Sequence, residues 1–213
     1  MINNSLDREK INRIDKSGLF TEYENWTNQA KDAIEIEPNI PKNQEFDNIL
    51  FVGMGGSATS GDIIQSWLRD ELKVPFEVLK DYKLPAYVNK TTLVIGASIS
   101  GETQETISAC IDAKTKNATV VSISSGGKLQ KVSEKNNIPH TKVKMALVPR
   151  ASLLYALLPS ITLLNKLNLI ESPKKEYDDI IELLNQQGKI INKINSLHSQ
   201  EKPFFPRLCF YFW

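Results

Sequence analysis

The strongest constraint in this sequence is a series of short apolar runs that alternate with amphipathic segments. The apolar runs have the length and composition of buried strands, and they lie near 48–53, 75–79, 92–97, 118–123 and 141–145. The segments between them have helical periodicity near 58–72, 102–116 and 127–136. Strands separated by helical crossovers pair in parallel, with helices on both faces. We therefore predict a three-layer αβα domain whose five-stranded parallel sheet has the flavodoxin-like strand order.

Two of the expected strands end in loops that suit an anion. The first loop is Gly53-Met54-Gly55-Gly56-Ser57, and the second is Ser98-Ile99-Ser100-Gly101-Glu102-Thr103. Glycines let the backbone approach a ligand, and a helix N-terminus favours negative charge. Serine and threonine are also favoured helix N-caps, but capping explains one hydroxyl of the second loop and not all three. The pattern favours a phosphate monoester at the carboxyl ends of the strands.

A dinucleotide is the alternative ligand, because Gly53-x-Gly55-x-x-Ala58 also fits the G-x-G-x-x-A fingerprint. That fingerprint expects an acidic residue at the end of the second strand, about 20 residues on. Glu77 lies 24 residues after Gly53, inside the expected strand, and Asp81 lies further along. A lone glycine pattern is a weak indication, so we favour the phosphate monoester over the dinucleotide.

Helices are expected to flank this core, over 5–15 and 18–34 before it and over 151–167 and 174–197 after it. Pro159 should kink or divide the third of these helices. That helix is apolar on nearly every face, so it needs partners on several sides. We expect this chain to expose a contiguous apolar patch there and around residues 204–213, and to self-associate. The aromatic-rich tail, residues 202–213, fits no element and reads as a strand without its sheet or as a shifted reading frame.

Composition narrows the functional classes. The 213 residues carry a net charge of +1, which gives no bias toward nucleic acid. The first ten residues are polar and no apolar run could span a bilayer, so we expect a cytoplasmic protein without a membrane partner. Cys110 and Cys209 have no metal or disulfide spacing, and His140 and His198, the two histidines, join no metal-binding cluster. We interpret Cys110 as a small buried side chain and His140 as structural or exposed.

Arg150 stands where a cation is unfavourable. It follows Val148-Pro149 at the start of the apolar helix, where the helix dipole opposes positive charge. We expect a compensating anion beside it, either a substrate oxygen or a nearby carboxylate.

Four motifs together resemble those of the bifunctional phosphoglucose/phosphomannose isomerases, which belong to the sugar-isomerase (SIS) superfamily. They are Gly53–Ser57 with Gly61-Asp62, Ser98–Thr106, Ser124–Leu129 and Pro149–Ser152, in the family's order and spacing. The resemblance implies interconversion of glucose 6-phosphate or mannose 6-phosphate with fructose 6-phosphate through a cis-enediolate. It implies no metal and no other cofactor.

The resemblance also assigns roles to residues. Phosphate binding falls to Gly56, Ser57, Ser98, Ser100 and Thr103. Arg150 becomes the catalytic residue that stabilises negative charge on the enediolate, which favours the transition state over the ground state. The implied partner is a hexose 6-phosphate, with no nucleic acid and no membrane, and the full-length parent is expected to be a homodimer.

The resemblance divides the chain into an N-terminal helical segment (1–44), an SIS sugar-phosphate-binding domain (45–170), and a linker helix with the aromatic tail (171–213). Family members carry a second SIS domain, which holds the glutamate base and is absent here, and Ala58 replaces a common glycine. This chain alone is therefore expected to bind hexose 6-phosphates weakly and to isomerise them little. A non-catalytic sugar-phosphate-binding module and an inactive truncated fragment remain the alternatives.

Overall fold

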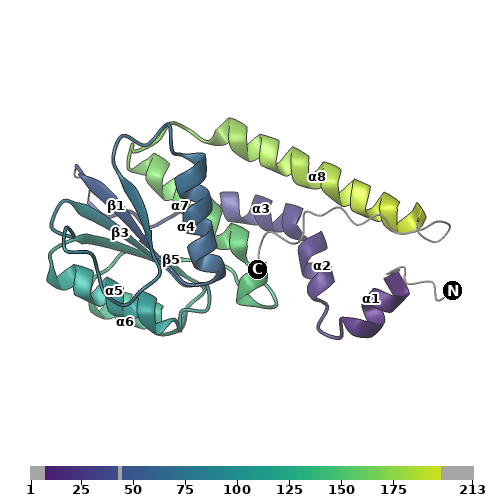
Figure 1. Ribbon diagram of the computed structural model, residues 1–213, viewed down its shortest axis with the longest axis horizontal. Helices are drawn as coiled ribbons and strands as arrows, with labels where there is room; N and C mark the ends of the chain where they lie inside the picture. Colours follow the sequence, from purple (N-terminus) through teal and green to yellow (C-terminus); the bar gives the residue numbers. More distant parts are fainter. Residues whose placement is uncertain (1–7, 43–44, 198–213) are drawn as a thin grey trace.

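The computed structural model describes residues 8–42 and 45–197, with side-chain surroundings for 9–42 and 45–187. Its middle layer is a five-stranded parallel sheet with strand order β2-β1-β3-β4-β5 (Figure 1). The strands are β1 (Asn48–Val52), β2 (Phe76–Leu79), β3 (Thr92–Ala97), β4 (Thr119–Ser124) and β5 (His140–Lys142). All four pairings are parallel, so the predicted fold class is confirmed.

Helices cover both faces of the sheet, as the alternation of its side chains requires. On β1, Ile49 and Phe51 face a core that also contains side chains of α3 (Trp26–Ile34), α4 (Gly56–Trp67) and α7 (Leu153–Lys166). Leu50 and Val52 face the opposite core, which is completed by α5 (Gln104–Thr115) and α6 (Gly127–Lys135). The two cores make the three layers that are visible in Figure 1.

Helix α5 packs very closely on the sheet through Gly96 of β3. A Cβ added at Gly96 would lie 2.2 Å from Cys110 Sγ. Cys110 is fully buried, as predicted, and burial raises the pKa of its thiol to about 12. This contact leaves no room for a side chain at position 96.

The N-terminal segment forms three short helices: α1 (Arg8–Ile14), α2 (Leu19–Glu24) and α3. The single helix expected over 18–34 is therefore divided, and the division is at Asn25. The Asn25 backbone N–H still donates to Thr21 and Glu22 at the end of α2, while its side chain accepts a bond from Asn28 Nδ2 at 2.7 Å. An asparagine that bonds locally offers the backbone an alternative to a continuous helix.

Helix α7 is continuous through Pro159, so of the kink or division expected at this proline the division is wrong. The exposed apolar patch expected on this helix is also wrong, because ten of its 14 residues are buried. The continuation of that patch expected around residues 204–213 lies outside the described residues. Helices α3 and α4 pack on it, and Tyr177 of α8 (Lys174–Leu197) donates a hydrogen bond of 3.0 Å to the Leu158 carbonyl. The partners that this helix needs are supplied by the same chain.

Two further elements complete the description. The 3-10 helix η1 (Pro149–Ala151) leads into α7, and α8 extends well beyond the sheet layers in the view of Figure 1. No helix within the described ranges combines the length and apolar character that a bilayer crossing would need. Residues 202–213, for which two interpretations were offered, lie outside the described residues.

Candidate functional site

Three loops meet at the carboxyl edge of the sheet. They follow the neighbouring strands β1, β3 and β4, and each leads into a helix: α4, α5 or α6. In none of these three helices does the side chain of the N-cap residue bond to the helix N-terminus. Helix N-termini leave backbone N–H groups without intrahelical partners, and at α6 the Lys128 and Leu129 N–H groups already donate to Glu102 and Gly101. The N-termini of α4 and α5 are therefore the ones that present donors to an anion.

The loop after β3 holds the three hydroxyls predicted to bind phosphate. Ser98 is 1% exposed, and its Oγ lies 2.8 Å from Thr103 Oγ1. Thr103 occupies the N-cap position of α5 but makes no capping bond, since its hydroxyl pairs with Ser98 instead. Ser100 Oγ accepts a bond of 3.3 Å from the Glu102 backbone N–H. The capping explanation therefore fails for Thr103.

The loop after β1 is connected to the loop after β3 by Ser57. Ser57 lies in the first turn of α4, is 9% exposed, and accepts a hydrogen bond of 3.4 Å from the Ile99 backbone N–H. Gly55 precedes this turn with φ of +53°, a conformation that glycine adopts without strain. Gly56 begins the helix, so the predicted pair Gly56 and Ser57 lies beside the second loop.

The loop after β4 closes the arrangement from the other side. Ser125 donates two bonds to the Ile99 carbonyl, from its backbone N–H at 2.9 Å and from its hydroxyl at 2.7 Å. Gly101 accepts a bond of 2.8 Å from the Leu129 N–H, and its backbone touches Gly126. The three loops are therefore one hydrogen-bonded unit that brings together Gly56, Ser57, Ser98, Ser100 and Thr103.

An ion pair between the loop after β3 and the first turn of α6 escaped the sequence analysis. Lys128 Nζ lies 3.0 Å from Glu102 Oε2, and the Lys128 backbone N–H donates to the other carboxylate oxygen at 3.1 Å. These bonds, and the lysine charge, hold the pKa of the Glu102 carboxyl below its ordinary value. Each residue directly follows a glycine shortly after a strand, which is the one sequence indication that could have paired them.

Arg150 lies beside the first loop, on η1. A Cβ added at Gly56 would be 3.7 Å from Arg150 Cα, so the arginine backbone lies next to the N-terminus of α4. Arg150 is exposed, and among the described residues no carboxylate forms an ion pair with it. Of the two anions expected beside it, the nearby carboxylate is thus not found.

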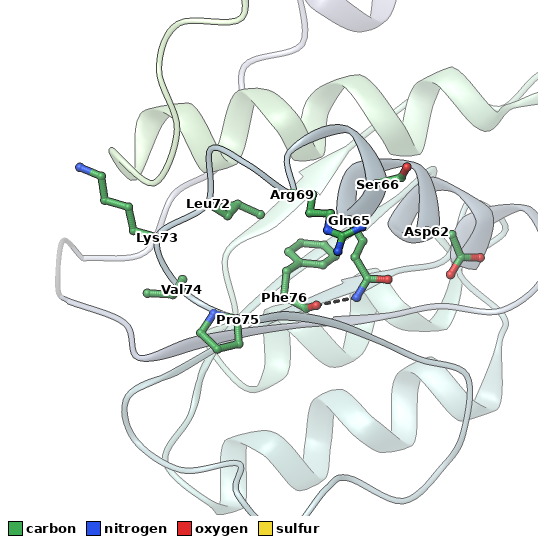
Figure 2. A pocket seen from close by; sticks show the side chains of 9 residues that line it. All are labelled: Asp62, Gln65, Ser66, Arg69, Leu72, Lys73, Val74, Pro75 and Phe76. Carbon is green, nitrogen blue, oxygen red and sulfur yellow. Dashed lines mark hydrogen bonds between the residues drawn. The ribbon is translucent and has the colours of Figure 1, made fainter.

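Two hollows of the surface lie elsewhere. One, of about 630 Å³, lies between the end of α4 and the start of β2, at the opposite edge of the sheet (Figure 2). Gln65 spans it with a bond of 2.6 Å to the Phe76 carbonyl. A second, of about 520 Å³, lies between α3, α7 and α8. Neither is lined by a predicted site residue, and within the described ranges no three His, Cys, Asp or Glu side chains gather as a metal site.

Comparison with known proteins agrees with the four motifs. The SIS domain family model matches residues 44–164. The bifunctional phosphoglucose/phosphomannose isomerase of Caldicellulosiruptor bescii is 38% identical over 169 residues, which cover 78% of this chain and 50% of that protein. Its counterpart from Thermoplasma volcanium is 34% identical over 171 residues, covering 80% of this chain and 52% of that protein. The chain spans about half the length of the curated relatives it matches.

Solved structures support the fold. The C-terminal domain of glucosamine-fructose-6-phosphate aminotransferase from Francisella tularensis superposes with a TM-score of 0.55 at 17% identity. The match covers 84% of this chain and 56% of that one. At this identity the likeness concerns the fold alone.

Proposed function

The chain belongs to the SIS domain family, and from that premise we propose that it provides the phosphate site and an arginine for the isomerisation of hexose 6-phosphates. The observation that carries the proposal is the joining of three loops around the N-termini of α4, α5 and α6. The relatives' names supply phosphoglucose and phosphomannose as substrates, and fructose 6-phosphate is the ketose that we propose for the same interconversion. A cytoplasmic location and a homodimeric parent are part of the same proposal.

The phosphate would bind at the carboxyl edge of the sheet. Backbone N–H groups of the first turns of α4 and α5 would donate to its oxygens, and the helix dipoles favour its negative charge. The Ser98 and Thr103 hydroxyls now bond to each other, so at least one of them would turn toward the ligand. Each neutral hydrogen bond contributes about 1 kcal/mol net, so we expect weak binding, on the order of 1 mM.

Arg150 would act on the sugar rather than on the phosphate. In aldose-to-ketose conversion a base removes the proton from C2, and negative charge develops on the two oxygens of the cis-enediolate. A proton then returns to C1, while the hydroxyl proton moves from O2 to O1. A guanidinium held where this charge develops lowers the barrier, because it stabilises the transition state more than the substrate. Arg150, beside the N-terminus of α4 and without a carboxylate partner in the described part of the chain, fits that role.

Titration of the 213-residue chain with fructose 6-phosphate and with fructose tests the proposal. We expect amide shifts at Gly56, Ser57 and Ser98 with the phosphorylated sugar and none with fructose at the same concentration. Equal responses to both sugars would contradict a phosphate site. An isomerase assay on the same sample separates the enzyme from a non-catalytic sugar-phosphate-binding module, and sedimentation measures whether the chain dimerises.

A further inference from the structure

His140 contacts two buried serines of β4, the strand that leads into one of the three loops of the candidate site. It is half-buried on β5, and its ring faces β4. Its Nδ1 lies 2.9 Å from Ser122 Oγ, and its Nε2 lies 3.4 Å from Ser124 Oγ. Both serine side chains are fully buried, so these bonds are shielded from water.

Ser124 connects the histidine to the loop. Ser124 is the last residue of β4. Its hydroxyl donates a hydrogen bond of 2.7 Å to the Gly126 carbonyl and accepts one of 3.2 Å from the Gly126 N–H. That carbonyl oxygen is the atom against which Gly101 packs. One chain of contacts thus runs from His140 through Ser124 and Gly126 to the loop that carries the phosphate-binding hydroxyls.

The bonds around Ser124 assign a tautomer to His140. Ser124 has one hydroxyl hydrogen and gives it to Gly126, so it accepts from the ring, and Nε2 carries a hydrogen. Nδ1 of the neutral ring then accepts from Ser122, whose oxygen accepts from Ser133 at 2.7 Å. Ser133 Oγ also lies 2.8 Å from the Leu129 carbonyl, and its single hydrogen cannot serve both acceptors. We assign that hydrogen to Ser122, because the Leu129 carbonyl lies within α6, where a helical backbone bond satisfies it.

The surroundings favour the neutral ring. Burial lowers the pKa of His140 below its ordinary value, and Lys142 on β5 lowers it further, while Glu134 on α6 opposes both. The other polar groups that face this residue are neutral: Ser122 and Ser124 on β4, Ser133 on α6, and Asn39, which donates to the His140 carbonyl at 2.6 Å.

We propose that His140 is a positioning residue of the phosphate site, whose Nε2–H holds Ser124 and thereby the Gly126 carbonyl on which Gly101 rests. The proposal rests on the function proposed for the loops. His140 touches no reacting atom in this account. It fixes the loop after β4 so that the loop after β3 keeps its shape before the ligand arrives.

A matched pair of variants tests this role. The amide nitrogen of glutamine can take the place of Nε2, whereas the shorter asparagine side chain reaches only the place of Nδ1. We expect His140→Gln to keep the fructose 6-phosphate affinity within about twofold, and His140→Asn to lose roughly tenfold, as one lost hydrogen bond implies. Ser133→Ala is the control, because it breaks the far arm of the network and leaves Ser124 untouched. Equal affinities of the glutamine and asparagine variants would overturn the proposal.

Measurements on the free protein separate this proposal from the proposed function. Nitrogen-15 NMR should show the Nε2–H tautomer, and exchange of the Gly126 amide should accelerate in His140→Asn but not in His140→Gln or Ser133→Ala. An Nδ1–H tautomer, or equal exchange in all three variants, would overturn the positioning role. If the wild-type chain binds no fructose 6-phosphate, the proposed function fails, and the tautomer and the exchange rates alone decide whether His140 positions the loop.

Discussion

A Cβ on Gly101 would lie 1.9 Å from the carbonyl oxygen of Gly126. The two residues stand in loops after the adjacent strands β3 and β4, so this contact joins two of the three loops of the candidate site. Gly101 also has φ of +69°, in the left-handed region that favours glycine. The site therefore depends on a position that no other residue can occupy without moving a neighbouring loop.

Gly101→Ala should separate these loops. The left-handed φ alone costs about 1–2 kcal/mol, and the clash with Gly126 adds about 1–3 kcal/mol. Gly18→Ala is the matched control, because Gly18 has φ of +77° but no atom within 4 Å of an added Cβ. Denaturant unfolding of both variants gives the comparison. Equal losses in the free energy of unfolding would mean that the clash of the added Cβ with Gly126 costs nothing measurable.

Burial of the Cys110 thiol should make the free energy of unfolding depend on pH. Its thiol has a pKa raised to about 12 in the fold, against about 8.5 in an unfolded chain. Because the fold favours the neutral thiol, the free energy of unfolding has its full value at pH values below the thiol pKa of the unfolded chain. It falls as the pH rises above that pKa.

Between about pH 7 and 9.5, the free energy of unfolding should therefore fall more steeply for a Cys209→Ser chain than for the same chain with Cys110→Ala. Denaturant unfolding under reducing conditions measures both slopes. The upper limit of pH keeps the buried tyrosines Tyr155 and Tyr177 out of the comparison, since their pKa values are also raised, to about 12. Parallel slopes would show that the Cys110 thiol is not buried as described.

Much of this fold could be predicted from the sequence, because a parallel sheet buried on both faces needs continuous apolar strands. Its five runs, their order and the positions of the loops are read from that pattern. The contact of Gly101 with Gly126 could not be predicted from the sequence, because it depends on which strands become neighbours and in what register. The division at Asn25 depends on a local side-chain bond that competes with the helix.

Helix α7 shows a different limit of prediction from the sequence. Its apolar character on nearly every face predicted several partners, and the structure supplies them. Periodicity does not say whether such partners come from the same chain or from another. His140 was likewise read as structural or exposed, because nothing in the sequence places Ser122 and Ser124 on either side of its ring.

Arg150→Gln tests the catalytic role that we propose for Arg150, through its effect on ligand binding. 5-Phospho-D-arabinonate carries a carboxylate where the enediolate would carry charge, whereas fructose 6-phosphate is neutral there. We expect the variant to weaken binding of the arabinonate by roughly 10- to 100-fold, as loss of a charged hydrogen bond implies, and binding of fructose 6-phosphate far less.

Calorimetry with both ligands gives the two ratios. Lys114→Gln is the control, because it removes one exposed positive charge near the far end of α5. If Arg150→Gln and Lys114→Gln weaken the arabinonate equally, general electrostatics explains the effect and Arg150 has no special role.

The most direct test of the proposed phosphate site replaces Ser98, Ser100 and Thr103 together by alanine. Removing both members of the Ser98–Thr103 pair leaves no orphaned partner, so the fold should survive. Calorimetric titration with fructose 6-phosphate should then show an affinity at least about tenfold below that of the wild type, while Ser108→Ala, an exposed hydroxyl on the same helix α5, changes nothing. A folded triple variant that binds fructose 6-phosphate as tightly as the wild type would contradict the account.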